Sequence, residues 1–120
     1  MDLLGPPAQL LLRLLSSTQE RARVVAGNIA NQNTPGYKRR EHRFEELLAN
    51  EMDKSHPNLT GIHAETVVDE LSPARGDGNN VVLEDELGAI QESVLRYDLY
   101  AAMLRGRAAI VSSAIHGERQ

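Results

Sequence analysis

The sequence predicts an all-α protein whose long N- and C-terminal helices form a coiled-coil hairpin in an assembly, with a short irregular or β-like middle segment. Near both ends of the 120-residue chain, hydrophobic residues recur at alternating steps of three and four, the spacing of a helix with an apolar seam. Between the ends, proline, glycine and polar residues interrupt this pattern. We therefore expect an N-terminal helix over 1–32, a corner and extended middle over 33–80, and a C-terminal heptad helix over 81–120.

The N-terminal helix is expected to begin after Pro6-Pro7, because proline is tolerated in the first turn of a helix. Five leucines between Leu10 and Leu15 spread over about 200° of the helix surface, which is wider than one seam. The seam itself consists of Ala8, Leu11, Leu15, Thr18, Ala22, Val25 and Ile29.

The C-terminal helix has the more regular pattern, with no missed step and no proline. Asn79 or Asn80 can cap its start, and Gly117 lies where glycine often ends a helix. Its seam consists of Leu83, Leu87, Ile90, Val94, Tyr97, Ala101, Leu104, Ala108, Val111 and Ile115. A second apolar stripe in its distal half consists of Leu95, Leu99, Met103 and Ile110.

The sequence of the middle segment predicts only a short strand and a short helix. A strand-like patch covers residues 62–68, and residues 41–52 can form one amphipathic helix that uses Phe44, Leu47 and Leu48. Two helices in a hairpin bury one stripe each, so the additional apolar side chains at both ends need other partners. We expect helices from other chains to cover them, or the segments to stay disordered until they do. The alternative is a monomeric three-helix bundle closed by residues 41–52.

Composition excludes several classes of protein. The net charge of -4 argues against a general nucleic-acid binder, and the absence of cysteine excludes disulfides and thiolate metal sites. No apolar run is long enough to span a membrane, and we expect no direct lipid anchor. The acidic start at Met1-Asp2 argues against a cleaved secretory signal.

Candidate chemistry is sparse, and we expect neither an enzyme nor a cofactor or metal site. No metal-ligand spacing relates the four histidines, His42, His56, His63 and His116, which are expected on the surface or in linkers. Ser16-Ser17 and Ser112-Ser113 lack a nearby base and are expected as helix-surface or small packing residues. The basic run from Lys38 to Arg40 is interleaved with glutamates, which favours a solvated or salt-bridged face over a phosphate site.

The stretch from Thr34 to Tyr37 predicts a type II turn, because Pro35 presets φ at the second position and Gly36 supplies a positive φ at the third. Three asparagines precede or begin this corner: Asn28, Asn31 and Asn33. Near a helix C-terminus, their side chains can bind the backbone groups that the ending helix leaves free.

The stretch "GNIANQNTPGYK" closely resembles the signature of the bacterial flagellar rod, hook and filament-junction family of axial proteins. The matching positions are Asn28, Ile29, Ala30, Asn31, Thr34, Pro35, Gly36 and Tyr37. The continuation through Arg40 to Phe44 is most similar to the proximal rod subfamily. A second motif agrees with that subfamily and consists of Asp77, Gly78, Asn79, Val81, Glu84, Glu86 and Tyr97.

The resemblance implies a structural subunit of the proximal rod in the flagellar basal body, exported through the flagellar type III apparatus without a cleaved signal peptide. Its implied partners are other flagellar rod subunits, a membrane-ring protein and a rod adaptor protein, in a homo- and hetero-oligomeric periplasmic tube that transmits torque from the ring to the hook. The expected assembly seam consists of Leu11, Leu15, Val25, Ile29, Leu83, Leu87, Ile90, Val94, Tyr97, Leu104, Val111 and Ile115.

Two other interpretations remain. Another proximal rod protein of the same family has similar motifs, although the spacing of Asp77-Gly78-Asn79 argues against it. A cytoplasmic coiled-coil regulator or export chaperone would explain the heptads, but it gives no reason for the corner that ends at Tyr37.

Overall fold

The computed structural model describes residues 5–118 and is mostly helical. Its elements in chain order are α1 (Ala8–Ala30), β1 (Arg40–Arg43), α2 (Glu45–Met52), the 3₁₀ helix η1 (Leu59–Gly61), β2 (Glu65–Val68) and α3 (Leu83–Glu118). The two long terminal helices are confirmed, as are a short middle helix and a strand within residues 62–68. The strand β1 was not predicted, and it turns the middle segment into a two-stranded ribbon.

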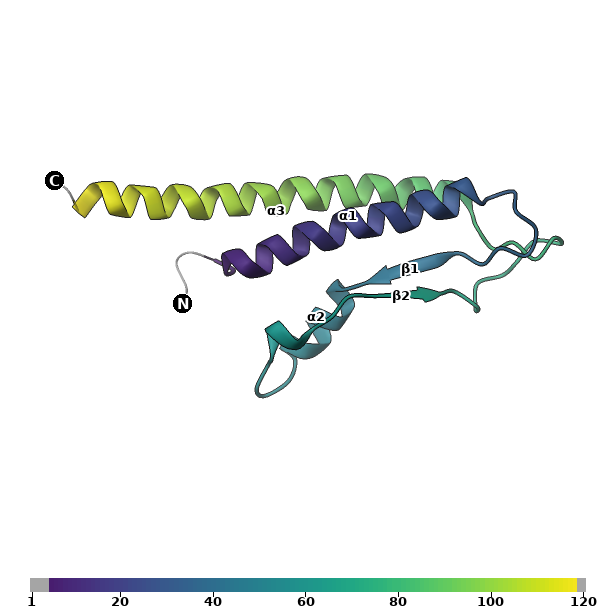
Figure 1. Ribbon diagram of the computed structural model, residues 1–120, viewed down its shortest axis with the longest axis horizontal. Coiled ribbons are helices and arrows are strands. Elements are labelled where there is room, and N and C mark those ends of the chain that lie inside the picture. The colour runs from purple at the N-terminus through teal and green to yellow at the C-terminus, as the bar shows by residue number, and fades with distance from the viewer. Residues whose placement is uncertain (1–4, 119–120) are drawn as a thin grey trace.

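The chain forms an elongated body of 70 × 30 × 16 Å. Helices α1 and α3 lie side by side and run in opposite directions, and α1 lies between α3 and the β1–β2 ribbon (Figure 1). The two strands pair antiparallel, with Arg40 opposite Val68 and Arg43 opposite Glu65. Among the described residues, no helix combines the length and the apolar character needed to cross a membrane.

Helix α1 is buried on two sides, which corrects the expectation that its broad apolar sector needs another chain. Leu11 and Leu14 are buried in one small core with residues of the middle segment, Phe44, Leu48 and Ile62. Arg13 fastens this core from α1, because its guanidinium lies 5.1 Å from the centre of the Phe44 ring and donates 2.6 Å to the Leu59 carbonyl. Of the leucines between positions 10 and 15, Leu12 alone remains exposed.

Helix α3 extends past the start of α1. Arg107 donates a hydrogen bond of 3.1 Å to the Pro6 carbonyl, and every residue from Ala108 to Gly117 is exposed. Tyr100 and Leu104 pack against the core that contains α2. The three-helix alternative is therefore right about this contact, but the eight residues of α2 leave the projecting end of α3 uncovered.

The face of α3 that packs within the chain is displaced from the predicted seam. Glu86 and Ser93 are buried, whereas the seam residues Leu87 and Val94 are 47% and 55% exposed. The inner face is polar because Glu86 binds partners on α1 and on the segment before β1, while serine is small enough to allow a close approach. The intramolecular hairpin therefore leaves much of the α3 seam unused.

Candidate functional site

The corner after α1 is a type II turn, as predicted. Gly36 has a φ of +77°, and the Tyr37 amide donates to the Thr34 carbonyl at 3.2 Å. A residue other than glycine at position 36 would be strained by this backbone conformation even though open space surrounds the site of its Cβ. The turn redirects the chain from the end of α1 toward β1.

A second glycine turn packs directly on the first. Gly78 has a φ of +84°, and a Cβ added there would lie 3.3 Å from the Gly36 Cα atom. The Gly36 amide donates to the Asp77 carbonyl at 2.8 Å, and the Lys38 ammonium donates to the Gly78 carbonyl. The two sequence motifs, separated by about 40 residues, therefore meet in one place. We call residues 28–41 and 69–86 together the corner junction.

The second loop also completes the end of α1. Asn79 donates from its side-chain amide to the carbonyls of Asn31 and Thr34, both at 2.9 Å. Arg75 donates to the Gln32 carbonyl and, at 2.7 Å, to the Val81 carbonyl. The carbonyls of Asn31, Gln32 and Thr34 lie at and beyond the end of α1, so these two side chains fasten the second loop to the turns that follow the helix.

Asn79 and Asn80 do not cap α3, which corrects the expectation. Asn79 uses its Oδ1 to accept the Val81 amide at 2.8 Å. Asn80 accepts the Arg39 amide at 2.7 Å and donates to the Asp69 carbonyl at 2.7 Å. Both amides are occupied in joining segments of the corner junction, so they are not available to the first turn of α3.

Asn28 is the centre of the corner junction and has no exposed surface. Its Oδ1 accepts the Arg40 amide at 2.9 Å and the Tyr37 hydroxyl at 3.0 Å. Its Nδ2 donates to the Arg40 carbonyl at 2.9 Å and to Glu86 Oε2 at 3.1 Å. The expected role at the end of α1 is therefore wrong for Asn28, although Asn31 does fill it by donating to the Gly27 carbonyl at 2.8 Å. Asn28 joins α1, the start of β1 and α3.

Arg39 forms ion pairs with three carboxylates close to Asn28. It donates to Glu86 at 2.7 Å, Glu41 at 2.6 Å and Asp69 at 3.0 Å. Burial lowers the pKa of Arg39, but the hydrogen bonds that it donates to these carboxylates outweigh burial and raise the pKa above its ordinary value. The prediction of a salt-bridged basic run is confirmed for Arg39, whose donors are directed at groups of the same chain.

Asp69 holds the loop after β2. It accepts the Ser72 hydroxyl at 2.6 Å and the Ser72 and Leu71 amides at 3.0 Å each. The bonds from Ser72 and then from Arg39 and Leu71 outweigh the effect of burial, so the pKa of Asp69 lies well below its ordinary value. Sequence reasoning missed Asp69 and Arg75. In the sequence, Asp69 is recognisable as an aspartate three residues before a serine, and Arg75 as an arginine beside a glycine turn.

The structure brings the predicted corner residues together but not the predicted seam residues. Leu11 and Val25 of α1 are buried, and Leu15, Ile29, Leu83, Ile90 and Leu104 are partly buried. The seam residues of α3 that remain exposed are Leu87, Val94, Tyr97, Val111 and Ile115. This exposed part of the α3 seam is a second candidate surface, and it lies outside the corner junction.

One imidazole of the described chain lies beside a serine hydroxyl, which corrects the expectation that Ser17 has no nearby base. His42 is half-buried in β1, unlike the surface position expected for it. Its ring nitrogens lie 3.2 Å from the Ser17 hydroxyl and 3.3 Å from the Thr66 hydroxyl. Burial lowers the pKa of His42, and its ring joins α1 to the ribbon. Residues 5–118 contain no group of three or more His, Asp or Glu side chains placed to hold a metal ion.

Comparisons with known proteins cover both the corner and the length of the chain. A family model described as "Flagella basal body rod protein" matches residues 15–38, the end of α1 and the first glycine turn. The chain is 29% identical over 113 residues to the flagellar basal body rod protein FlgB of Aquifex aeolicus (strain VF5), covering 90% of this chain and 91% of the relative. It is 26% identical over 122 residues to FlgB of Aeromonas hydrophila, covering 88% and 89%. The chain is therefore similar to FlgB proteins of the flagellar basal body rod along most of its length, and these matches support a FlgB-like rod protein.

Proposed function

We propose that this chain is a structural subunit of the proximal rod, which self-assembles through its terminal helices and helps to transmit torque from the membrane ring to the hook. The observation that carries the proposal is the apolar surface of α3 that the other described residues leave exposed. Large exposed apolar side chains continue along the helix from Leu87 to Ile115. Continuous exposed apolar surface on a folded protein marks a contact with another protein.

The corner junction supports the mechanical part of the proposal. Its hydrogen bonds fasten the end of α1 to the start of α3, so the two helices are joined at one end by polar contacts with defined directions. A hairpin with a fixed end can pass a load from one subunit to the next without changing the angle between its helices. We assign the corner motif to this role and the α3 seam to assembly.

The proposed partners follow from the family. They are other rod subunits, the membrane-ring protein and the rod adaptor protein, in a homo- and hetero-oligomeric assembly in the periplasm. We propose export without cleavage of the N-terminus. Another proximal rod protein remains the nearest alternative. A cytoplasmic coiled-coil regulator or chaperone would also use an exposed seam, but it would have no need for the buried network around Asn28.

The experiment is to locate the tagged chain in basal bodies purified from cells that lack the untagged copy. We expect it in preparations from which filaments and hooks have been removed, and we expect motility in soft agar to depend on it. Leu99→Asp, on the outer face of α3, should lower its amount in basal bodies, whereas Asp98→Asn at the neighbouring exposed position should not. A chain found only in the cytoplasm, with normal basal bodies in its absence, would contradict the proposal.

A further inference from the structure

We propose that the projecting end of α3 docks on a second copy of this chain, in the groove between that copy's α1 and α3, with the two α3 helices parallel and shifted by three heptads. The inference rests on the proposed function as a rod subunit, and it names the two surfaces and the register of one contact. Each copy carries both surfaces at different places along its length.

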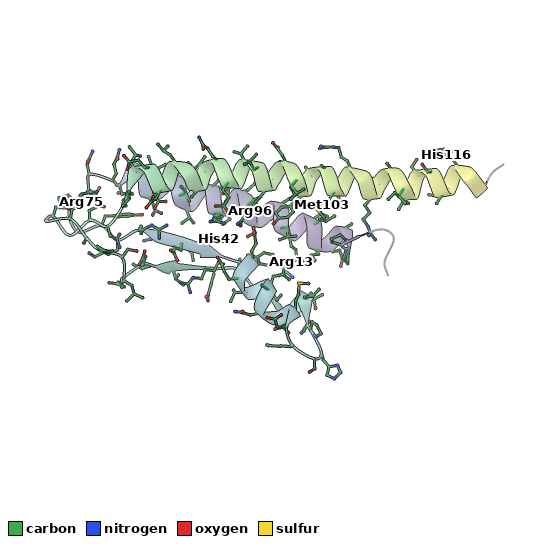
Figure 2. The ribbon with its side chains drawn as sticks, turned by 180° about the vertical axis from the view of Figure 1, so that it is seen from behind. Arg13, His42, Arg75, Arg96, Met103 and His116 are labelled. Atoms are coloured by element: carbon green, nitrogen blue, oxygen red, sulfur yellow. The ribbon has the colours of Figure 1, made fainter. Side chains whose placement is uncertain are left out.

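The docked segment is the exposed, projecting part of α3. Beyond Arg107, every residue of α3 from Ala108 to Gly117 is exposed, and His116 lies at the opposite end of the molecule from Arg75 of the corner junction (Figure 2). Val111 and Ile115 place apolar side chains on the seam of this segment. Residues 99–117 contain Arg105, Arg107 and His116 but no acidic residue, so the segment is both apolar and basic.

The groove lies between α1 and α3 near the middle of the hairpin and has a volume of about 280 Å³. Its lining residues are Thr18, Gln19, Ala22, Ser93, Val94 and Tyr97. Ser93 is only 2% exposed, yet its hydroxyl has no hydrogen-bond partner among the described residues. Buried hydroxyls are almost always paired, so an unpaired one in this groove indicates a contact that a single chain does not complete.

The register follows from the seam. Val94 and Ile115 are 21 residues apart, and so are Ile90 and Val111. Because 21 residues are three whole heptads, a parallel shift of roughly 31 Å places the seam of the projecting segment level with the seam beside the groove, in the same phase. The same shift places Arg105 of one copy level with Glu84 of the next.

Charge favours this arrangement over an unshifted parallel one. The first half of α3, residues 83–98, contains five acidic residues and one arginine, whereas residues 99–117 contain two arginines and no acidic residue. An unshifted parallel pair sets like charges against each other, while the shifted pair sets the basic half on the acidic half. The groove and the docked segment are different surfaces, so the contact is heterologous and can repeat along a polar assembly.

The test uses disulfide cross-linking, for which the chain is suited because it contains no cysteine. The double variant Val94→Cys with Ile115→Cys is expressed as the sole copy, and basal bodies are oxidised and separated without reducing agent. Both positions are exposed in the single chain. We expect a ladder of dimers and larger species, because each copy carries one cysteine of each kind, at least tenfold stronger than for either single variant.

Two further double-cysteine variants serve as controls that test the register. Leu95→Cys with Ile115→Cys moves one cysteine about 100° around the helix, off the groove, and should give no ladder. Leu87→Cys with Ile115→Cys is one heptad out of register in the parallel arrangement, but these two positions meet if α3 packs antiparallel about Ala101. A ladder or dimer as strong for the Leu87 pair as for the Val94 pair would overturn the inference.

The remaining outcomes also decide it. Incorporation of the Val94 and Ile115 double variant without any cross-link, or with cross-links only to a different protein, overturns the docking of a second copy. If this variant does not reach basal bodies, the reaction is run on the purified full chain at high concentration, where absence of the ladder overturns the inference. If the unaltered chain is itself absent from basal bodies, the proposed function fails, and the purified-chain reaction still decides the register.

Discussion

The two ends of the molecule differ in which side chains they bury and which they expose. At the corner junction, polar and charged side chains such as Asn28 and Glu86 are buried and paired with one another. At the projecting end of α3, apolar side chains such as Val111 and Ile115 are 41% and 49% exposed. Buried polar groups that are all hydrogen-bonded fix the relative orientation of the segments that they join. Exposed apolar area instead favours association with another chain.

The chain therefore stabilises only one of its two ends through contacts within itself. The corner junction brings α1, the ribbon and the start of α3 into one unit through contacts within the chain. The projecting end has few such contacts, and in the proposed assembly another chain covers it. Substitutions at the corner should therefore change the stability of the isolated chain, and substitutions at the projecting end should change its assembly.

Removing the buried carboxylate should produce the largest loss of stability. Glu86→Ala leaves Asn28 and Arg39 without their shared acceptor. Because breaking a buried pair strands a charge, we expect the free energy of unfolding in urea to fall by about 3 kcal/mol. Glu84→Ala, at an exposed position two residues away, should change it by less than about 0.5 kcal/mol. Equal effects of the two variants would show that the network at Glu86 does not stabilise the corner.

Asn28→Ala should cost somewhat less, about 2 kcal/mol, because it leaves a backbone amide and carbonyl of Arg40 and a tyrosine hydroxyl with one partner fewer. Urea unfolding measures the effect, and Asn33→Ala is the matched control at an exposed asparagine of the same corner. A neutral result for Asn28→Ala would mean that water replaces the side chain and that the junction is looser than described.

The two glycine turns should differ from each other. Gly36→Ala has only the backbone cost of a positive φ, about 1 kcal/mol, because nothing lies within 4 Å of the added Cβ. Gly78→Ala adds a contact at 3.3 Å with the Gly36 backbone, so it should lower the melting temperature more. If both variants melt at the same temperature, the two turns can separate at little cost, and the close packing of the motifs is not part of the stability.

Acid should weaken the corner through Asp69. Its pKa in the folded chain lies below the ordinary value of 3.8, so the unfolded chain binds more protons over this range and stability falls as the pH is lowered. The contribution is complete above about pH 4 and is lost progressively below it. Unfolding midpoints measured from pH 5 to pH 2 should fall less steeply for Asp69→Asn than for the unaltered chain. Parallel curves would show that Asp69 is not held by Arg39 and Ser72 in solution.

Changes at the projecting end should have the smallest effect on the isolated chain. Ile115→Asp should alter the free energy of unfolding by less than about 0.5 kcal/mol, because the side chain is already 49% exposed. It should nevertheless reduce the amount of protein in basal bodies, since it places a charge on the seam. Ala114→Asp, about 100° away around the helix, is the control. A large loss of stability with Ile115→Asp would show that this end is covered within the chain.

The regular features of the fold could be predicted because they follow from local rules. Heptad spacing predicts both long helices, and Pro35 with Gly36 predicts the type II turn. The strand β1 could not be read from "REHR", which has no apolar alternation, because it exists through pairing with β2 and contact with α1. Its partner β2 carries the β-branched residues Thr66, Val67 and Val68 and was recognisable.

The candidate site was harder to predict than the fold. The sequence identified Asn28 and Gly78 as parts of two motifs, but not that they meet, because that contact is set by the antiparallel packing of α1 and α3. It also predicts that a hairpin buries one apolar stripe of α3. The packed face instead contains Glu86, since a carboxylate that finds Arg39 and Asn28 can be buried where periodicity expects an apolar residue.

Hydrogen exchange along α3 in the purified, dilute chain tests the difference between the two ends most directly. Amides from Glu86 to Leu104, packed against α1 and the core, should be protected to nearly the same degree as those of α1. Amides from Ala108 to Gly117 should exchange orders of magnitude faster, because a helical segment of about ten residues without a packed face is marginal in water. Protection that stays uniform from Glu86 to Gly117 at low concentration would contradict the account, since the projecting end would then be stable without a second chain.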